Sequence, residues 1–304
     1  MRIRPRGAVT SALLAGTLAF AAAASGGEAH HVGSYTWTRD DPAFGGFSGF
    51  DISEDGARFT AISDRSWFVT GEIRRENGRI AAIDPSPIVP LKNAKGIQPK
   101  GAAGDSEGLA ISDDGRIFVS YEGYARVAEF ETPERAIPLP RHPDFSGLEI
   151  NASLEALAID NEGRLYTLPE QSGDLATPFP VWRMDAEGWH DFATIPRRGT
   201  FLAVGADIGP DGMFYLLERG FTGFGFRSRV RRFELTETGF GAEETLFESP
   251  VWRHDNLEGI GVWRDGAGQI VLTMISDDNF FAIQRTELVE YVVPESLAPN
   301  PERP

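Results

Sequence analysis

Cysteine is absent from all 304 residues of the chain. Disulfide bonds, a thiol nucleophile and a zinc–thiolate site are therefore excluded. A protein without disulfides holds its fold by core packing or by a bound metal.

Histidine is scarce as well. The chain has five histidines, and none of them lies in a ligand-spaced pair, so a histidine-rich transition-metal site is not expected. No Gly-x-Ser-x-Gly sequence occurs, and Phe47-Ser48-Gly49 lacks the strand-to-helix setting of a nucleophile elbow. The residue pattern therefore disfavours a serine triad.

Basic residues are outnumbered by acidic ones. The chain has 29 Lys and Arg against 45 Asp and Glu, a net charge of −16. Such a surface disfavours nucleic acids and anionic membranes and attracts cations. We therefore expect no nucleic-acid partner, a small anionic or ester substrate, and a monomer, since the sequence carries no dimer signal.

Long apolar runs are missing apart from one near the start. Ala8 to Ala24 is a run of small and apolar residues that follows Arg2, Arg4 and Arg6. It is shorter than the ~20 apolar residues of a spanning helix, so a membrane anchor is the weaker alternative. The pattern predicts a Sec-type signal peptide over residues 1–29 and a periplasmic or secreted protein. Residues 30–304 are then one domain without a membrane span.

What the chain does contain is a repeated hairpin. Five segments align without gaps from the start of a strand to a glycine: Ser48–Gly56, Glu107–Gly115, Glu155–Gly163, Val204–Gly212 and Glu258–Gly266. Self-similarity at a spacing of roughly 50 residues is typical of a propeller or a solenoid. No stretch reads as a sustained amphipathic helix, which excludes a helical solenoid.

The repeats predict an all-β fold, a β-propeller of four-stranded blades. Dipeptides such as Asp55-Gly56 and Asp114-Gly115 lie between apolar runs, which indicates two-residue type I′ hairpin turns. Val32–Trp37 and Glu287–Val293 are both β-prone, and we expect them to pair and close the ring. Five blades are readable, and the long gap from Ser48 to Glu107 leaves six open.

Acidic residues recur at one end of these hairpins. The first strand begins with Glu107, Glu155 or Glu258 in three copies, and Asp207 lies within the fourth. The second strand ends on an acid in every copy: Asp64, Glu122, Glu170, Glu218 and Asp277. The hairpin pairing predicts that these carboxylates gather at a mouth on one propeller face. One acid per blade is also common as an architectural acceptor of backbone N–H groups from the next blade.

Four segments resemble the exported "esterase-like activity of phytase" family, also called phytase-like domain proteins. They are Asp105–Ala110, Asn151–Ala158, Leu217–Arg219 and Asp255–Ile260. The resemblance extends from about Gly45 to Val293. It implies ester or phosphoester hydrolysis centred on the recurrent Glu and Asp residues. The chain departs from the pattern where Val204 and Ser48 replace the glutamate.

Converging carboxylates raise one another's pKa unless a cation lies among them. Calcium suits them, because it takes six to eight oxygen ligands. We expect Ca²⁺ ligands at Glu107, Glu155 and Glu258, with Asp207 less certain. A rim or outer set would consist of Glu122, Glu170, Glu218 and Asp277.

These residues predict a metal-dependent hydrolase of phosphoesters or related esters. The metal would polarise a phosphoryl or acyl oxygen, and a free glutamate among Glu107, Glu155 and Glu258 would act as general base. Arg219 would contact an anionic substrate, or else form an ion pair with a neighbouring acid. Two alternatives remain open: a lactonase-like calcium propeller, for which Asn151, Asn256 and Asn279 are available, and a non-catalytic binding propeller.

Overall fold

The computed structural model describes residues 28–294. The predicted signal peptide lies almost wholly outside the described residues and stays a prediction. Ala29 is buried, and its amide donates to the Leu246 carbonyl at 2.7 Å, so the packed structure includes this residue. Within residues 28–294, no helix is long and apolar enough to cross a membrane.

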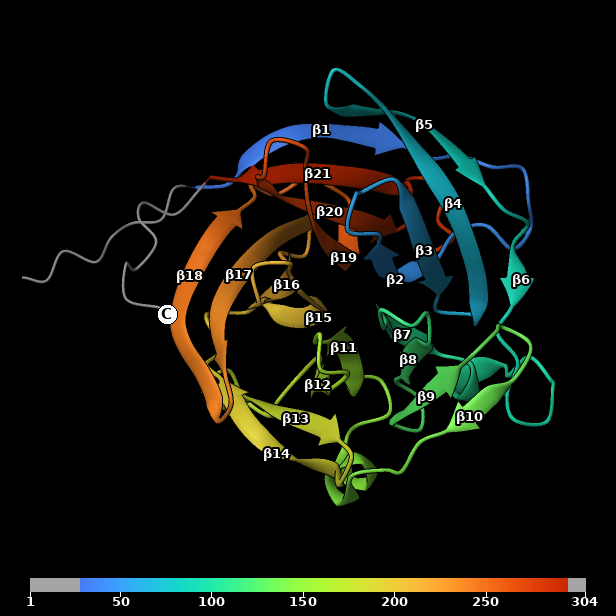
Figure 1. Ribbon diagram of the computed structural model, residues 1–304, viewed down its shortest axis with the longest axis vertical. Helices are drawn as coiled ribbons and strands as arrows, with labels where there is room; N and C mark the ends of the chain where they lie inside the picture. The colour runs from blue at the N-terminus through green and yellow to red at the C-terminus, as the bar shows by residue number, and fades with distance from the viewer. Residues whose placement is uncertain (1–27, 295–304) are drawn as a thin grey trace, which may run out of the picture.

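Five antiparallel sheets are arranged around a central axis (Figure 1). Blade 1 contains β2 (Phe47–Ile52), β3 (Arg58–Ser63), β4 (Trp67–Glu76) and β5 (Arg79–Pro85), with β6 (Val89–Pro90) paired to β4. Blade 2 contains β7 (Ser106–Ile111), β8 (Ile117–Tyr121), β9 (Arg126–Phe130) and β10 (Ala136–Pro138). Blade 3 contains β11 (Leu154–Ile159), β12 (Leu165–Pro169), β13 (Phe179–Asp185) and β14 (Gly188–Ile195). The predicted order of one hairpin followed by two outer strands is confirmed in these blades.

The last two blades complete the ring. Blade 4 contains β15 (Leu202–Ile208), β16 (Met213–Phe221), β17 (Phe226–Thr236) and β18 (Gly239–Glu248). Blade 5 contains β19 (Asn256–Arg264), β20 (Ile270–Asp277), β21 (Glu287–Val293) and β1 (His30–Thr36). Strand β1 pairs with β21, so one blade holds strands from both ends of the described chain. The prediction of a propeller closed by this pairing is confirmed, with five blades and not six.

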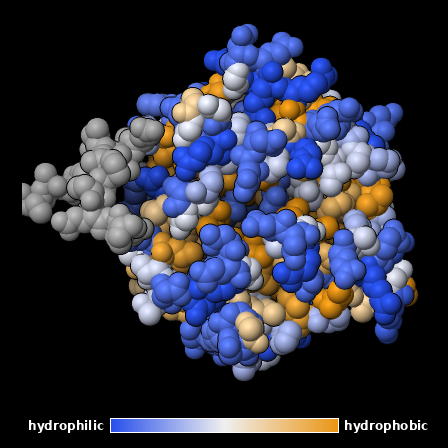
Figure 2. Space-filling model, viewed as in Figure 1, coloured by the Kyte–Doolittle hydropathy of each residue, from blue (hydrophilic) through white to orange (hydrophobic). Residues whose placement is uncertain are grey.

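The innermost strands β2, β7, β11, β15 and β19 surround the axis and contact one another in a ring (Figure 1). Glycines allow this close approach. A Cβ on Gly108 would lie 2.4 Å from the Glu155 carbonyl oxygen, and one on Gly205 would lie 2.4 Å from that of Glu258. Further out, buried apolar side chains fill the space between blades, as where Phe50 and Phe59 of blade 1 share one buried cluster with Trp263 and Ile275 of blade 5. Figure 2 shows one face of the ring, where hydrophilic residues predominate.

The hairpin turns differ from the predicted type I′ form. In blade 1 the amide of Ser53 donates to Arg58 and that of Gly56 to Ser53, and only Gly56 has a positive φ, of 69°. This is a longer turn that ends on a left-handed glycine. In blade 5 that glycine is Gly268, not Gly266. Local hydrogen bonds of the aspartates stabilise these turns, so a second positive φ is not needed.

The order of the strands within each blade gives the propeller two distinct faces. The hairpin turns between the first and second strands of all blades lie at one end, here called the turn face. The starts of the inner strands and the ends of the second strands lie at the other, here called the mouth face. Long connections between blades also lie on the mouth face, including η1 (Gly101–Ala103) and η2 (Pro143–Gly147).

Candidate functional site

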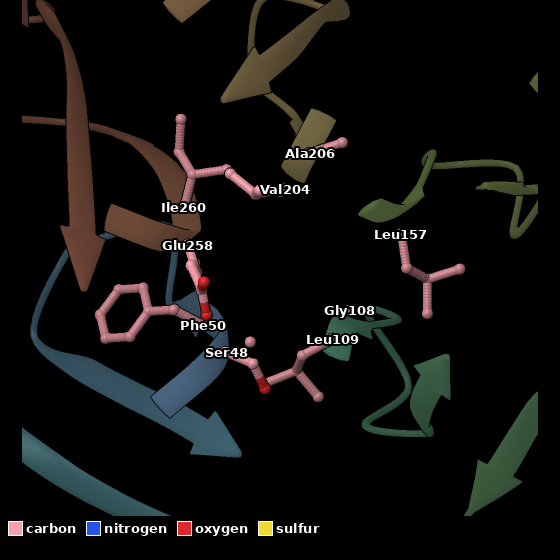
Figure 3. Close-up of a pocket in the computed structure, with 12 residues that line it drawn as sticks. Ser48, Phe50, Gly108, Leu109, Leu157, Val204, Ala206, Glu258 and Ile260 are labelled. Atoms are coloured by element: carbon pink, nitrogen blue, oxygen red, sulfur yellow. The ribbon is translucent and has the colours of Figure 1, made fainter. Parts of the chain in front are cut away.

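Every inner strand has a β-bulge where it begins at the mouth face. The register shifts between Phe47 and Gly49, and at the equivalent point of β7, β11, β15 and β19. A bulge re-aims a side chain out of the regular alternation. The residues at the shifts are Ser48, Glu107, Glu155, Val204 and Glu258. Figure 3 shows Ser48, Val204 and Glu258 around the space on the propeller axis.

A second set of side chains lies at the ends of the second strands. The amides of Asp64, Glu122 and Glu170 donate to the residues just before the bulges. In blades 4 and 5 the same position belongs to Arg219, which pairs with Leu202, and to Asp277, which pairs with Asn256. Blade 4 therefore places an arginine where the other four blades place an acid.

This register corrects the prediction for Glu218. Its carboxylate accepts hydrogen bonds from Arg229 Nε at 2.7 Å and Arg231 Nη2 at 2.7 Å, and its side chain is fully buried. Glu218 is equivalent to Pro169 of blade 3, which pairs with Leu154 as Glu218 pairs with Ala203. Its side chain belongs to an ion-pair cluster inside blade 4, and the structure does not bring it together with the other predicted ligands.

Asp207 also lies away from the mouth. Its carboxylate accepts from the Val262 amide of the next blade at 2.6 Å and from the Ile208 amide at 2.7 Å. Asp51 bonds the Ile111 amide in the same way at 3.2 Å. These two aspartates have the architectural role of inner acids, and the structure does not bring Asp207 into the candidate site.

The remaining predicted residues come together. We define the mouth cluster as Asp64, Asp105, Glu107, Glu122, Glu155, Glu170, Arg219, Asn256, Glu258 and Asp277. Oxygens of Asp105, Glu107 and Glu122 lie within 4.8 Å of one another, and so do oxygens of Glu122, Glu155 and Glu170. Glu122 belongs to both groups, so the carboxylates of blades 2 and 3 form one continuous surface.

Three buried glutamates of the mouth cluster form no ion pair with a Lys or Arg among residues 28–294: Glu107, Glu122 and Glu155. Glu107 and Glu155 are only 8% and 7% exposed. Burial and repulsion from neighbouring glutamates raise the pKa of Glu155, and the charge of Arg219, which lowers that pKa, does not offset them. Isolated ionised carboxylates are costly to bury. The pair of Glu107 and Glu155 is therefore the feature of the cluster that most requires explanation.

Arg219 neutralises the opposite side of the cluster. Its Nη2 donates to Glu170 Oε1 at 2.5 Å, and its Nη1 forms an ion pair with Glu258 and donates to Asn256 Oδ1 at 3.2 Å. The ion-pair alternative for Arg219 is thus confirmed, with acids of blades 3 and 5 in place of its sequence neighbour. Burial lowers the pKa of Arg219, but the Glu258, Glu170 and Glu155 carboxylates outweigh it and raise that pKa.

Burial and mutual repulsion raise the pKa of several acids of the mouth cluster. Burial, followed by repulsion from Glu155 and Glu258, raises the pKa of Glu107 well above its usual range. Burial and Glu170 do the same for the pKa of Glu155. Burial, with Asp105 or Asp277 respectively adding repulsion, raises the pKa of Glu122 and of Glu258 to about 8. The fold thus holds more negative charge here than Arg219 compensates.

The donor set fits calcium. All ligand candidates are carboxylate or amide oxygens, which hard divalent cations prefer. Ca–O distances of about 2.3–2.6 Å place opposite ligands about 5 Å apart, and each group of three oxygens meets that limit. A third group, His142, Asp144 and Asp191, lies at the periphery with two exposed acids, and the His142 ring accepts from the Asp144 amide.

Three members of the cluster were not among the predicted catalytic or metal residues: Asp64, Asp105 and Asn256. Asp105 and Asn256 each lie two positions before a bulge glutamate. The recurring Asp-x-Glu and Asn-x-Glu spacing was a usable signal. Asn256 Nδ2 donates to Glu258 Oε1 at 2.8 Å, so it orients a carboxylate that Arg219 also holds.

Structural comparison returns other propeller-like chains. An exo-β-1,3-galactanase from Phanerochaete chrysosporium aligns at 11% identity and a TM-score of 0.52, covering 86% of this chain and 64% of that one. A gluconolactonase from Xanthomonas campestris aligns at 12% identity and a TM-score of 0.48, covering 88% and 98%. A streptogramin B lyase aligns at 14% identity and a TM-score of 0.41, covering 87% and 74%. These likenesses concern the fold alone.

No curated protein matches the chain. The sequence profile of the family described as "Phytase-like: Esterase-like activity of phytase" matches residues 42–280, which include blades 1 to 4, the two inner strands of blade 5 and the whole mouth cluster. The chain belongs to the esterase-like activity of phytase family.

Proposed function

We propose that the protein is an exported hydrolase of phosphoesters or related esters that works with calcium in the mouth cluster. The observation that carries the proposal is the buried pair Glu107 and Glu155, neither of which forms an ion pair with a Lys or Arg among the described residues. A divalent cation removes the cost of burying such charges. The family description agrees with ester chemistry.

Calcium bound there would polarise a phosphoryl or acyl oxygen and lower the pKa of a coordinated water. Either oxygen group could hold it: Asp105, Glu107 and Glu122, or Glu122, Glu155 and Glu170. The side of Arg219 and Asn256 would face the substrate. A guanidinium already oriented by Glu170 and Glu258 binds an anionic or developing negative oxygen without further ordering.

Proton transfer would fall to a glutamate that accepts no hydrogen bond from an arginine and does not hold the metal. Glu155 meets this description when the Asp105, Glu107 and Glu122 group holds calcium, and its raised pKa makes it a stronger base than an ordinary carboxylate once it ionises. Glu258 is a weaker candidate, because Arg219 and Asn256 both donate to it. A base role for Glu155 therefore predicts a loss of kcat on substitution by glutamine.

The test combines calcium and substitution. The chain from residue 28 onward is assayed on aryl phosphates and aryl esters with calcium, with magnesium and with chelator. We expect turnover only with calcium, and a loss of at least about 100-fold in kcat for Glu107→Gln and Glu155→Gln. Glu162→Gln, an exposed acid on the turn face, is the matched control.

Two results would contradict the proposal. Equal turnover in chelator would remove calcium from the chemistry. Calcium-dependent stabilisation without turnover of any ester would favour a non-catalytic binding propeller, and the Glu107→Gln and Glu155→Gln variants would then alter binding alone.

A lactonase is the second candidate, because Asn256 lies beside Glu258 and Asp277 and supplies an amide oxygen to the same mouth. Lactones are cyclic esters, so they belong in the same screen. Preferred turnover of an aldonolactone over aryl esters would support this reading.

Export is tested separately. Expression of the full chain in a Gram-negative host should yield a shortened protein in the periplasmic fraction, whose N-terminus is read by mass spectrometry. A cytoplasmic protein that retains residues 1–27 would contradict the predicted signal peptide.

A further inference from the structure

Exposed apolar side chains are distributed unevenly over the propeller. Most of the large hydrophobic residues that are exposed among residues 28–294 belong to connections on the mouth face: Ile97, Tyr124, Ile150, Leu175, Phe221, Phe224, Trp252, Phe281 and Ile283. Ile137, in the outer strand β10, is the exception. None of these residues lies in a hairpin turn of the turn face. Contiguous exposed apolar surface of this kind marks a binding site or an interface.

Five of these side chains come from three connections of blades 4 and 5, and we call them the apolar arc: Phe221, Phe224, Trp252, Phe281 and Ile283. Phe224 is 83% exposed, and Trp252 is 73% exposed. The three connections contact one another. The Trp252 amide donates to the Phe226 carbonyl at 3.1 Å, and a Cβ on Gly225 would lie 2.7 Å from the Trp252 ring.

The third connection is joined through Asp255. Its carboxylate accepts from Gln284 Nε2 at 3.1 Å and from the Arg285 amide at 3.0 Å. These bonds hold the segment that carries Phe281 and Ile283 against the segment that carries Trp252. The apolar arc is thus built by specific contacts between connections.

Trp252 has an unfavourable backbone conformation as well as an exposed ring. Its φ is 69°, in the left-handed region that bulky residues rarely adopt. Phe280, next to Phe281, has a φ of 52°. Backbone strain of this kind persists where the surrounding structure imposes it, and it is concentrated at ligand-binding sites. An exposed tryptophan held in strain indicates that the ring is positioned for a ligand.

The apolar arc is continuous with the mouth cluster along the chain. Phe221 ends the strand that carries Arg219, and the Trp252 connection leads directly to Asn256. The connection with Phe281 follows Asp277 at the end of β20. The apolar arc therefore borders the Arg219 and Asn256 side of the mouth, where the substrate is placed under the proposed function.

The neighbouring charge restricts what can bind. Anionic membrane surfaces attract basic segments, whereas this face combines the apolar arc with a surplus of carboxylates on a chain of net charge −16. A ligand that contacts both features needs an apolar body and a head that reaches the carboxylates through a cation.

We propose that the apolar arc binds the acyl or alkyl chain of an amphipathic ester whose polar head lies in the mouth cluster. The substrate class would then be long-chain esters or phosphoesters, in preference to small, fully polar ones. This inference rests on the proposed function, since it places the ester group at the same calcium-binding mouth.

Kinetics with a homologous series test it. The kcat/KM values for p-nitrophenyl acetate and p-nitrophenyl octanoate, below its micelle concentration, are compared with calcium present. We expect the octanoate-to-acetate ratio to fall roughly tenfold in Trp252→Ala and in Phe224→Ala, as hydrophobic specificity contacts do. Ile137→Ala, an exposed apolar residue on an outer strand, should leave the ratio unchanged.

A binding measurement separates this inference from the proposed function. Calorimetry with octylphosphonate and methylphosphonate, in calcium, needs no turnover. Tighter binding of octylphosphonate that weakens in Trp252→Ala supports the inference even if no ester is hydrolysed, an outcome that would reject only the proposed function. Equal binding of the two phosphonates in the wild type overturns the inference. So does a dimer, or binding to neutral phosphatidylcholine vesicles, that Trp252→Ala abolishes without changing the octanoate-to-acetate ratio.

Discussion

The two ends of the same five hairpins use acidic residues in opposite ways. On the turn face, Asp55 accepts from Ser53 and from the Ala57 amide, and Asp265 accepts from two amides of its own turn. The hydrogen bond from Ser53 lowers the pKa of Asp55, and that from Ser112 lowers the pKa of Asp114. On the mouth face, burial is the largest cause of the pKa shifts, and it raises the pKa of Glu107, Glu122, Glu155 and Glu258.

The turn-face acids therefore stabilise the fold, whereas ionised mouth-face acids destabilise it. A turn aspartate finds its donors within a few residues of its own chain, so it stabilises local structure as it forms. A mouth glutamate meets other glutamates from neighbouring blades. Buried carboxylates that repel one another break the rule that buried charges are paired. In a fold that otherwise follows such rules, a site that breaks one is expected to be functional.

The largest expected effect is on an acid that lies beside the mouth without belonging to it. Glu218→Gln leaves Arg229 and Arg231 buried without their carboxylate, and breaking a buried ion pair costs about 3–5 kcal/mol. Thermal unfolding should show a large fall in Tm, while the rise in Tm on adding calcium stays as in the wild type. Loss of the calcium response in this variant would place Glu218 in the metal site after all.

Glu155→Gln should have the opposite pattern. It removes a buried carboxylate that forms no ion pair and that neighbouring glutamates repel, so Tm in chelator should stay the same or rise. A ligand present at 100 times its Kd contributes about 2.7 kcal/mol of stability, and the variant should lose most of that increment. An unchanged calcium response, measured by the same thermal unfolding, would contradict the assignment of Glu155 as a ligand.

The pH dependence of stability follows from the raised pKa values. Burial and carboxylate neighbours raise the pKa of Glu122 and Glu258 to about 8 and, with burial again the largest cause, that of Asp64 to about 7. The folded state then binds more protons than the unfolded state between pH ~4 and pH ~8, so the free energy of unfolding falls as pH rises through this window. Urea unfolding in chelator should show this trend.

Calcium should counteract the fall in the free energy of unfolding near pH 8. Because protons compete with the metal for carboxylates, the calcium-induced rise in the free energy of unfolding should be larger at pH 8 than at pH 5. A calcium effect that is largest at acidic pH would argue against carboxylate ligands.

The smallest effect is expected on the turn face. Gly212 has a φ of 73° and open space where a Cβ would lie. Gly212→Ala should therefore cost only the left-handed strain of an alanine, about 1–2 kcal/mol, with no change in the calcium response. A loss of activity or of calcium binding in this variant would show that the two faces are coupled more strongly than their separate hydrogen bonds indicate.

Much of the fold could be read from the sequence because hairpins are local. Alternating strands and recurring glycines near the turns predicted the blades, and two β-prone terminal segments predicted the closing pair β1 and β21. The mouth glutamates Glu107, Glu155 and Glu258 were identified for the same reason, since they recur at one place in the repeat. The type I′ turns were wrong, because side-chain acceptors such as Asp55 favour a longer turn that composition alone does not distinguish.

The errors at the mouth come from a single residue of register. The acid at the end of each second strand was taken as equivalent, which equated Glu218 with Glu170, whereas the bulges and pairing equate Arg219 with it. A shift of one residue moves a side chain to the other face of a strand. The role of Asp207 could not be predicted from its own repeat either, because it depends on the Val262 amide that the next blade presents.

What the sequence by itself determined is the repeat, the propeller with its closing strand pair, and the side of each hairpin on which acids gather. These features depend on patterns within about fifty residues, which is the range of one repeat. Only the tertiary structure decided which acids meet without a counter-charge, that Arg219 joins blades 3 and 5, and that the apolar arc borders the mouth. Those facts depend on distances between blades, and electrostatic and apolar contacts across blades form only when the ring has closed.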